Sequence, residues 1–308
     1  MKKENYKVFD LTKKRPNVLL LGNGLTWKSI PWHKLIKEIK MPDINMSNYI
    51  ELNKDGEFDK FTVPNTILTA ATSIVNDKER RNVYENVLPN TFSPNPYLKH
   101  LLSLPFDAIL TTNYTYELES EVLPSYPSLS KETKRKYSFV TRADRDPVYL
   151  VHTYNSISSA PDIWHIHGEL RRPSSIVLTH DEYAKHVRAI TQYSSDRGTE
   201  YAKTQTAMKF KSWVDYILFG NVHILGLGMD YSEFDLWWLL NRRKREKAPT
   251  GKITFYEANK NEEISIKHQA LKDIGVDVET LNLTIINSSD YSAFYEKSIN
   301  AIEKAIIT

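Results

Sequence analysis

NVLLLGNGLT, residues 17–26, is a short apolar run that leads into a glycine-rich turn. Runs of this length, bounded by Gly or Asn, are typical of parallel strands that are covered on both faces of a sheet. In the turn, Gly22, Asn23 and Gly24 would let a ligand approach the backbone, and the nearby amides could hold a phosphate. The turn lacks the full G-x-G-x-x-G spacing of dinucleotide-binding proteins, so it equally fits a tight strand–helix turn without a ligand.

Further short apolar runs follow along the chain, with helical stretches between them. Their residues are 106–112, 163–167, 175–179, 223–227 and 252–257, with a weaker run at 277–283. Strands that alternate with helices pair in parallel, and the helices then cover both faces of the sheet. The sequence therefore predicts a Rossmann-like α/β fold with a doubly wound, mostly parallel sheet.

The helices between these strands are marked by apolar residues at helical spacing. One is predicted after Ser29, a second within 65–89 and a third over 96–104. About 80 residues thus separate the first strand from the second, which is too long for a simple crossover. We therefore predict a single domain over 1–308, with a helical insertion at about 41–104 and an irregular insertion at about 120–160.

The composition is that of a globular protein, with 41% hydrophobic and 26% charged residues. The net charge of +3 does not support a bulk electrostatic grip on nucleic acid, and the basic run at 242–245 is interpreted as a solvated helix end. The chain has no Cys, which excludes disulfides, thiolate nucleophiles and cysteine-ligated zinc. No apolar run reaches the length of a signal sequence or a membrane span, so we expect a soluble, cytoplasmic protein.

The segment ILTTNYTYELE, residues 109–119, carries polar side chains past the end of a predicted strand. Thr112, Asn113 and Tyr114 would lie at the carboxyl end of this strand, where open α/β sheets bind their ligands. The side-chain amide of Asn113 can donate and accept, so it could hold a ribose hydroxyl and a water molecule together. The alternative is that Asn113 caps the helix that follows.

The segment IWHIHGEL, residues 163–170, places two histidines at alternate positions of a predicted strand. His165 and His167 should therefore point to the same face, and Gly168 permits the chain to turn away sharply. Two histidines could indicate a metal site, but no third ligand is evident, so we expect no metal ion. The more economical interpretation is one acid–base residue at the strand end, His167, with His165 in a supporting or structural role.

The segment ILGLGMDYSEFDLWWLL, residues 224–240, begins as a strand and continues as a strongly apolar helix. Gly226 and Gly228 form a second turn where the backbone could approach a phosphate or a ribose, although a purely structural turn fits equally well. Ser232 and Asp235 have the spacing of a capping box for the helix. We interpret the aromatic residues of this helix as part of the core.

Together and in this order, these segments resemble the sirtuin-like domain, and more narrowly the sirtuin-like NAD hydrolases of bacterial antiphage defence. The resemblance runs from about residue 17 to 258. It is carried by GNG (22–24), TTNY (111–114), HIHG (165–168), SIVLTHDEY (175–183) and GLGMDYSEFDLWWLL (226–240). It implies that Gly22 and Gly24 lie on the NAD phosphates, and that Asn113 and His167 face the nicotinamide ribose. Further NAD contacts that it implies are those of Asn23, Thr112, Tyr114, Gly168 and Asp230, and of Gly226, Gly228, Tyr256 and Glu257 around the adenosine half.

Two departures from the family pattern bear on the chemistry. Thr115 stands where the family usually has an Asp that helps to hold nicotinamide or orient the site. The four-cysteine zinc module that is normal in protein-deacylating sirtuins cannot form in a chain without Cys. The resemblance therefore implies hydrolysis of the substrate NAD to nicotinamide and ADP-ribose. Two alternatives stay open, namely an NAD-dependent protein deacylase and a non-catalytic subunit that binds NAD or ADP-ribose.

The resemblance also implies a means of control, because unrestrained NAD hydrolysis would be toxic. Antiphage relatives are held inactive until infection is sensed, and no sensor region is evident in this sequence. We therefore expect control by a separately encoded regulatory or sensor protein, by assembly into a homo-oligomer, or by both.

Overall fold

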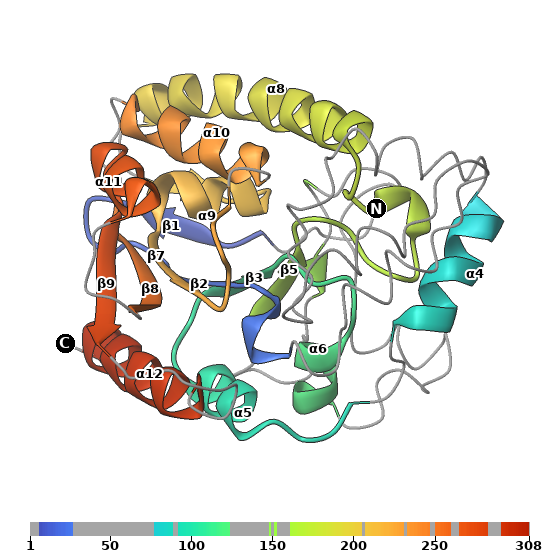
Figure 1. Cartoon of the computed structure of the whole chain (residues 1–308). Coiled ribbons are helices and arrows are strands. Elements are labelled where there is room, and N and C mark those ends of the chain that lie inside the picture. The colour runs from blue at the N-terminus through green and yellow to red at the C-terminus, as the bar shows by residue number, and fades with distance from the viewer. Residues whose placement is uncertain are drawn as a thin grey trace.

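Seven strands form the main sheet among the residues that the computed structural model describes (Figure 1). The described residues are 6–26, 77–88, 92–123, 148, 151–152, 161–204, 207–230, 233–246, 250–259, 265–282 and 291–307. The strands, in their order across the sheet, are β4 (Val151–His152), β5 (Asp162–His165), β3 (Ala108–Thr111), β2 (Asn17–Leu21), β7 (Asn221–Leu225), β8 (Ile253–Asn259) and β9 (Asp277–Asn282). All neighbours are parallel except at one edge, where β4 runs antiparallel to β5.

The chain winds in both directions from the centre of this sheet. From β2 it proceeds to β3 and β5 on one side, and it later returns to build β7, β8 and β9 on the other side. The order therefore reverses between β2 and β7, and ligands of open α/β sheets bind at such a switch point, beyond the carboxyl ends of the strands. This topology confirms the predicted doubly wound, mostly parallel α/β fold.

The two faces of the sheet have separate hydrophobic cores, because successive side chains of a strand point to opposite faces. In β2, Val18 and Leu20 belong to one core, while Leu19 and Leu21 belong to the other. The helices that contribute to the first core are α8 (His180–Thr204), α9 (Trp213–Phe219), α10 (Phe234–Lys244) and α11 (Ile266–Asp273). Those of the second core are α4 (Asp77–Val87), α5 (Pro96–Ser103), α6 (Glu117–Val122) and α12 (Tyr291–Ile307). Figure 1 shows the sheet between α8, α9 and α10 on one side and α5, α6 and α12 on the other.

The predicted strand at 175–179 is wrong, although the other predicted strands form. Residues Pro173–Ser175 make a short 3-10 helix, η4, and the buried apolar residues after it pair with no strand. The segment ends instead at the start of α8, where Thr179 and Glu182 exchange side-chain and backbone hydrogen bonds in the manner of a capping box. A buried, irregular segment thus has the same apolar pattern as a strand.

Three short strands were not expected from the sequence. They are β4 at the edge of the sheet and the antiparallel pair β1 (Val8–Asp10) and β6 (Ala207–Lys209). Each has only two or three residues, which is too few for an alternating pattern to be recognised.

Several predicted elements lie wholly or partly outside the described residues. The helix after Ser29 lies outside them, as do the first part of the predicted helix at 65–89 and most of the irregular insertion at 120–160. The helical insertion at 41–104 is described only from residue 77 onward, where α4 and α5 lie. The helix predicted at 96–104 is confirmed as α5, and the extent of both insertions stays a prediction.

The interpretation of the basic run at 242–245 as a solvated helix end is wrong for Arg243. Its guanidinium is buried and donates hydrogen bonds to the backbone oxygens of Ile217, Gly220 and Gly251. Two of these carbonyls end α9, where a cation is favourable. Burial lowers the pKa of Arg243 to about 9.

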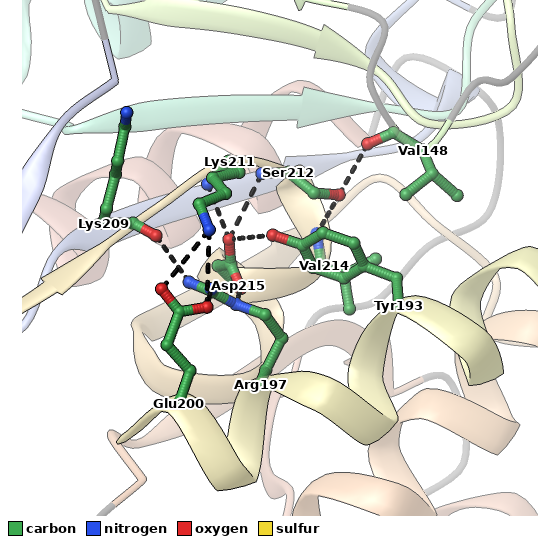
Figure 2. Close-up of polar contacts among 9 residues, drawn as sticks. All are labelled: Val148, Tyr193, Arg197, Glu200, Lys209, Lys211, Ser212, Val214 and Asp215. Atoms are coloured by element: carbon green, nitrogen blue, oxygen red, sulfur yellow. Dashed lines mark hydrogen bonds and ion pairs between the residues drawn. The ribbon is translucent and has the colours of Figure 1, made fainter. Parts of the chain in front are cut away.

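A buried ion pair attaches the long helix α8 to α9 (Figure 2). The carboxylate of Asp215, near the start of α9, accepts hydrogen bonds from the Nε of Arg197 at 2.6 Å and from the hydroxyl of Tyr193 at 2.5 Å. The same carboxylate accepts from the backbone nitrogens of Lys211 and Ser212, which completes the capping box of α9. Arg197 and Asp215 are both almost fully buried.

We expect Asp215→Ala to lower the free energy of unfolding by about 3–5 kcal/mol, because it removes the buried partner of the Arg197 cation and leaves it with the partly exposed carboxylate of Glu200. Denaturant unfolding of the wild type and the variant measures this difference. The double variant Arg197→Met/Asp215→Leu is the control, since it removes both charges together and should recover part of the loss. Equal stability of wild type and Asp215→Ala would show that the pair is not a structural anchor.

Candidate functional site

Four of the segments singled out in the sequence follow neighbouring strands of the sheet. The glycine turn follows β2, Asn113 comes two residues after β3, His167 comes two residues after β5, and Gly226 comes directly after β7. The strands β5, β3, β2 and β7 are adjacent and parallel. All four segments therefore lie along one edge of the sheet, at its switch point.

The two glycine turns pack directly against each other. The backbone nitrogen of Gly24 donates to the oxygen of Gly226 at 2.7 Å, and that of Gly22 donates to the oxygen of Leu225 at 3.1 Å. A Cβ atom on Gly22 would lie 2.4 Å from the oxygen of Gly226, and one on Gly24 would lie 2.8 Å from the same oxygen. This close approach explains the glycines structurally, and their contact with NAD phosphates stays a prediction.

Asn113 is held by hydrogen bonds from its side-chain nitrogen. Its Nδ2 donates to the Oε1 of Glu117 and, at 3.3 Å, to the Oγ1 of Thr26. The hydroxyl of Thr26 in turn donates to the Oδ1 of Asn23 at 3.1 Å, which connects Asn113 to the first glycine turn. With both amide protons committed, the Oδ1 of Asn113 is the atom that can accept from a ligand, and it accepts no hydrogen bond from the described residues.

The alternative role of Asn113 as a helix cap is not supported by the structure. The next helix, α6, begins at Glu117, and its N-cap residue is Tyr116. No side chain forms a cap hydrogen bond there. Asn113 is therefore a buried residue with polar partners, and it does not cap the helix.

Glu117 brings a carboxylate to Asn113 although Thr115 replaces the Asp of the family pattern. Its Oε1 accepts from Asn113, and its Oε2 accepts from the hydroxyl of Thr115 at 2.6 Å. Burial raises the pKa of Glu117 from 4.5 to about 7 against these hydrogen bonds. Because Asn113 lies in the loop before α6 and Glu117 is the first residue of that helix, no regular helical spacing in the sequence marks this pair.

His165 supports Asn113 from the neighbouring strand. Its Nδ1 donates to the backbone oxygen of Asn113 at 2.9 Å, and its Nε2 donates to the Oε1 of Glu119 at 2.7 Å. Burial opposes protonation of the ring, but the charge of Glu119 prevails and raises the pKa of His165 to about 9. The fully buried ring is therefore a cation that fixes the loop after β3.

His167 belongs to a different polar cluster from His165. β5 ends at His165, so the predicted strand through residue 167 is too long and the two side chains do not share partners. The Nε2 of His167 donates to the Oδ2 of Asp235 at 2.9 Å, and its Nδ1 lies 3.8 Å from the Oε2 of Glu233. The hydroxyl of Tyr183 donates to the same Glu233 oxygen at 3.0 Å.

The predicted capping box at the start of α10 is wrong, because Asp235 has another partner. The helix begins after Glu233 with no side-chain cap hydrogen bond, and Ser232 lies outside the described residues. Burial alone would raise the pKa of Asp235, but the charge and hydrogen bond of His167 lower it below its usual range. Asp235 is thus a buried carboxylate that orients His167.

Hydrogen bonds join the loop after β3 to the turn after β5. The hydroxyl of Tyr114 donates to the oxygen of Val177 at 2.8 Å, and the nitrogen of Val177 donates to the oxygen of His167 at 2.9 Å. The nitrogen of Leu170 donates to the oxygen of Tyr114 at 2.9 Å.

Gly168 has a φ of +88°, and a Cβ there would lie 2.1 Å from the oxygen of Ser175. Tyr114 and Gly168 therefore have structural roles, whatever contact they make with NAD.

The residues predicted around the adenosine half are divided between the edge of the sheet and the core. The carboxylate of Glu257 pairs with Lys267 and His268, and the ammonium of Lys267 also donates to the oxygen of Gly228 at 3.0 Å. Because Lys267 contacts both residues, Glu257 and Gly228 lie close together. Tyr256, in contrast, is buried beside His223, with its hydroxyl 3.0 Å from the Nδ1 of that ring.

Two further predicted contact residues lie in the same region of the site. Thr112 directly follows β3 and is largely buried. Asp230 lies between the second glycine turn and α10, and its backbone oxygen accepts from the indole nitrogen of Trp237 at 3.1 Å. Contact of either residue with NAD stays a prediction.

Comparison with known protein families shows which family contains this chain. Residues 107–279, more than half of the 308-residue chain, match the family model described as the SIR2-like domain. The chain belongs to the SIR2-like domain family. The match spans β3 to β9 and includes Asn113, His167 and Gly226, whereas the first glycine turn precedes it. No curated protein matches the chain significantly.

Membership of the SIR2-like family implies a protein that binds and uses NAD. The site fits this use, because its polar groups gather at the switch point of a Rossmann-like sheet, where nucleotides bind. Among the described helices, none has both the length and the apolar character needed to span a bilayer.

We expect Glu117→Gln to flatten the dependence of stability on pH between 4.5 and about 7. In this range the folded chain takes up a proton at Glu117 that the unfolded chain has released, because the pKa is raised on folding. Protonated Glu117 stabilises the fold fully below pH 4.5. As the pH rises toward 7, this contribution is lost and the free energy of unfolding falls by about 3 kcal/mol.

Denaturant unfolding of both proteins at several pH values tests this expectation. Gln has nearly the same shape as Glu but does not titrate. The difference in free energy of unfolding between the two proteins should therefore change by about 3 kcal/mol between pH 4.5 and about 7. A difference that stays constant with pH would contradict the prediction. The amide oxygen of Gln can still accept from Asn113, and its nitrogen can donate to the hydroxyl of Thr115, so the variant tests the titration of Glu117 alone.

Proposed function

We propose that this chain is an NAD glycohydrolase that cleaves NAD to nicotinamide and ADP-ribose. The observation that carries the proposal is the placement of two polar groups after neighbouring strands, at one edge of the sheet. One is Asn113, whose amide protons are committed so that its Oδ1 accepts from a ligand. The other is His167, whose Nε2 proton is held by the buried carboxylate of Asp235. In the proposal, these two residues contact the nicotinamide ribose, while the glycine turns and Glu257 line the rest of the NAD site.

The reaction breaks the bond between the nicotinamide nitrogen and the ribose carbon. The bonding electrons leave with nicotinamide, and positive charge spreads over the ribose ring as in other glycosidic cleavages. A water molecule, held by the Oδ1 of Asn113, then forms the new bond to the ribose carbon. Its proton passes to the Nδ1 of His167, and Asp235 stabilises the imidazolium that results.

We further propose that the enzyme depletes NAD as an effector of bacterial antiphage defence. This part rests on the resemblance to antiphage NAD hydrolases and on the absence of cysteine, which disfavours the zinc-bearing deacylases. Control would come from a separately encoded sensor or from assembly of several copies. Full-rate NAD depletion by the freshly purified chain alone would overturn the idea of such control.

The test is product analysis by chromatography after the protein is mixed with NAD, alone and with the products of neighbouring genes. Release of nicotinamide and ADP-ribose without any peptide would support the proposal. A requirement for an acyl-lysine peptide, with O-acyl-ADP-ribose as product, would replace it by the deacylase. Binding of NAD or ADP-ribose without turnover under any of these conditions would replace it by a non-catalytic module.

A further inference from the structure

Three buried side chains with metal-ligating atoms meet beside the turn that follows β5. They are His167 from this turn, His186 from α8 and Asp235 from α10, and one ligand atom of each lies within 4.8 Å of the others. All three side chains are at least 97% buried, so the cluster is shielded from water. The sequence showed no third ligand beside the two histidines of HIHG, because His186 and Asp235 come from distant helices.

The spacing of these atoms suits a small divalent ion. The Nε2 of His167 lies 2.9 Å from the Oδ2 of Asp235, and the Nε2 of His186 lies 3.5 Å from the same oxygen. Ligands at about 2.0–2.1 Å from a tetrahedral zinc ion are roughly 3.3–3.4 Å apart. Two of the three distances between ligand atoms are therefore within about 0.5 Å of this value, and the third, between the two histidines, is at most 4.8 Å.

His186 has no explanation in the hydrogen bonding of the protein. Among the described residues, neither of its ring nitrogens has a hydrogen-bond partner, and the Oδ1 of Asp235 has none either. Buried polar atoms are nearly always paired, and unpaired ones indicate an ion or a water molecule. His165, in contrast, uses both of its nitrogens in hydrogen bonds to the protein. Stacking on Trp213 explains the burial of the aromatic ring of His186, but it gives the two ring nitrogens no hydrogen-bond partner.

We propose that His167, His186 and Asp235 form a binding site for Zn²⁺. Two imidazoles and one carboxylate are ligands for zinc and other divalent transition metals, whereas Mg²⁺ and Ca²⁺ prefer sites made of oxygen atoms. A fourth position remains for water, since the carboxylate of Glu233 lies beside the other ring nitrogen of His167, Nδ1. The site needs no cysteine, so it differs from the zinc module of deacylases.

Zinc at this site would regulate the NAD glycohydrolase, and this consequence rests on the proposed function. A metal ion on the Nε2 of His167 displaces the proton that Asp235 now accepts. The displaced proton passes to Nδ1, which carries none in the neutral metal-free ring, so neither ring nitrogen of the metal-bound imidazole can accept the proton of the attacking water. Zinc is therefore an inhibitor that acts by occupying the general base.

The primary test measures zinc binding in the absence of NAD. Chelator-treated full-length protein should take one equivalent of Zn²⁺ in competition with a chromophoric chelator, and Co²⁺ should give the absorption of a tetrahedral site. His186→Phe should weaken binding by more than about 100-fold, beyond the loss typical of a residue that only supports a ligand. The control is His180→Gln, an exposed histidine of the same helix, which should bind zinc as the wild type does.

Thermal unfolding separates a metal ligand from a packing residue. Because the nitrogens of His186 make no hydrogen bond, metal-free His186→Phe should be as stable as the wild type or more stable. Added zinc should raise the melting temperature of the wild type but not that of the variant. If Phe is too large for this position, His186→Gln gives the same comparison.

Three results would overturn the site, namely no stoichiometric zinc in the wild type, equal affinity in His186→Phe, or a buried water molecule alone in the cluster. The regulatory step is tested by the factor by which zinc slows NAD hydrolysis relative to each protein's own metal-free rate. This factor should be large for the wild type and close to one for His186→Phe. Zinc binding by a protein that hydrolyses no NAD when metal-free and mixed with the products of neighbouring genes would refute the proposed function alone. NAD hydrolysis without zinc binding would refute the site alone.

Discussion

Asn113→Ala is expected to lower the rate of NAD hydrolysis by about 10²–10³-fold, the loss typical of removing one group that stabilises a transition state. The substitution removes the Oδ1 that accepts from the ribose hydroxyl or the attacking water. It also removes the amide that connects Glu117 to Thr26. Release of nicotinamide, measured over a range of NAD concentrations, separates the loss in kcat from any change in KM.

The control for this variant is Asn241→Ala, which removes an exposed Asn of α10 whose side chain bonds only the preceding helical turn. It should leave the rate unchanged. Asn113→Ala should also remain folded, and thermal unfolding will show any loss caused by leaving Glu117 without its amide donor. An unchanged kcat in folded Asn113→Ala would refute the assignment of this residue.

The fold was predictable because the strongest signals are local. The run at 17–22 is apolar at every position from Val18 to Leu21, as expected for a strand that serves two cores at once. The strand β7 also contributes to both cores, although His223 interrupts its apolar run. The short pair of β1 and β6 joins segments about two hundred residues apart in the chain, and no local pattern could indicate it.

The candidate site was predictable only in part, for a related reason. Asn113 and His167 could be singled out because each follows a strand. Their partners could not, since those depend on how distant elements pack. Glu117 lies within the quoted TTNYTYELE segment, but Asp235 was read as a helix cap because that role needs only local spacing. His186 lies in the first third of a 25-residue helix, and nothing in its neighbourhood marks it as different from a packing residue.

His167→Ala is expected to lower the rate of NAD hydrolysis by about 10²–10⁴-fold, the usual loss on removing a positioned general base. The alanine also leaves the carboxylate of Asp235 buried without its hydrogen-bond donor. The free energy of unfolding should therefore fall as well, and activity must be measured at a temperature where the variant is folded.

His167→Gln separates the two roles of this residue more cleanly than alanine does. The amide of Gln can still donate a hydrogen bond to Asp235, so the buried carboxylate keeps a partner, but no nitrogen of Gln accepts a proton near neutral pH. If His167 is the base, the Gln variant should be nearly as stable as the wild type and nearly as inactive as His167→Ala. Asp235→Asn should have an intermediate rate, because the imidazole remains but the charge that stabilises its protonated form is lost. Wild-type turnover by His167→Gln would mean that His167 only completes the packing around Asp235, and the base would then have to be sought elsewhere along this edge of the sheet.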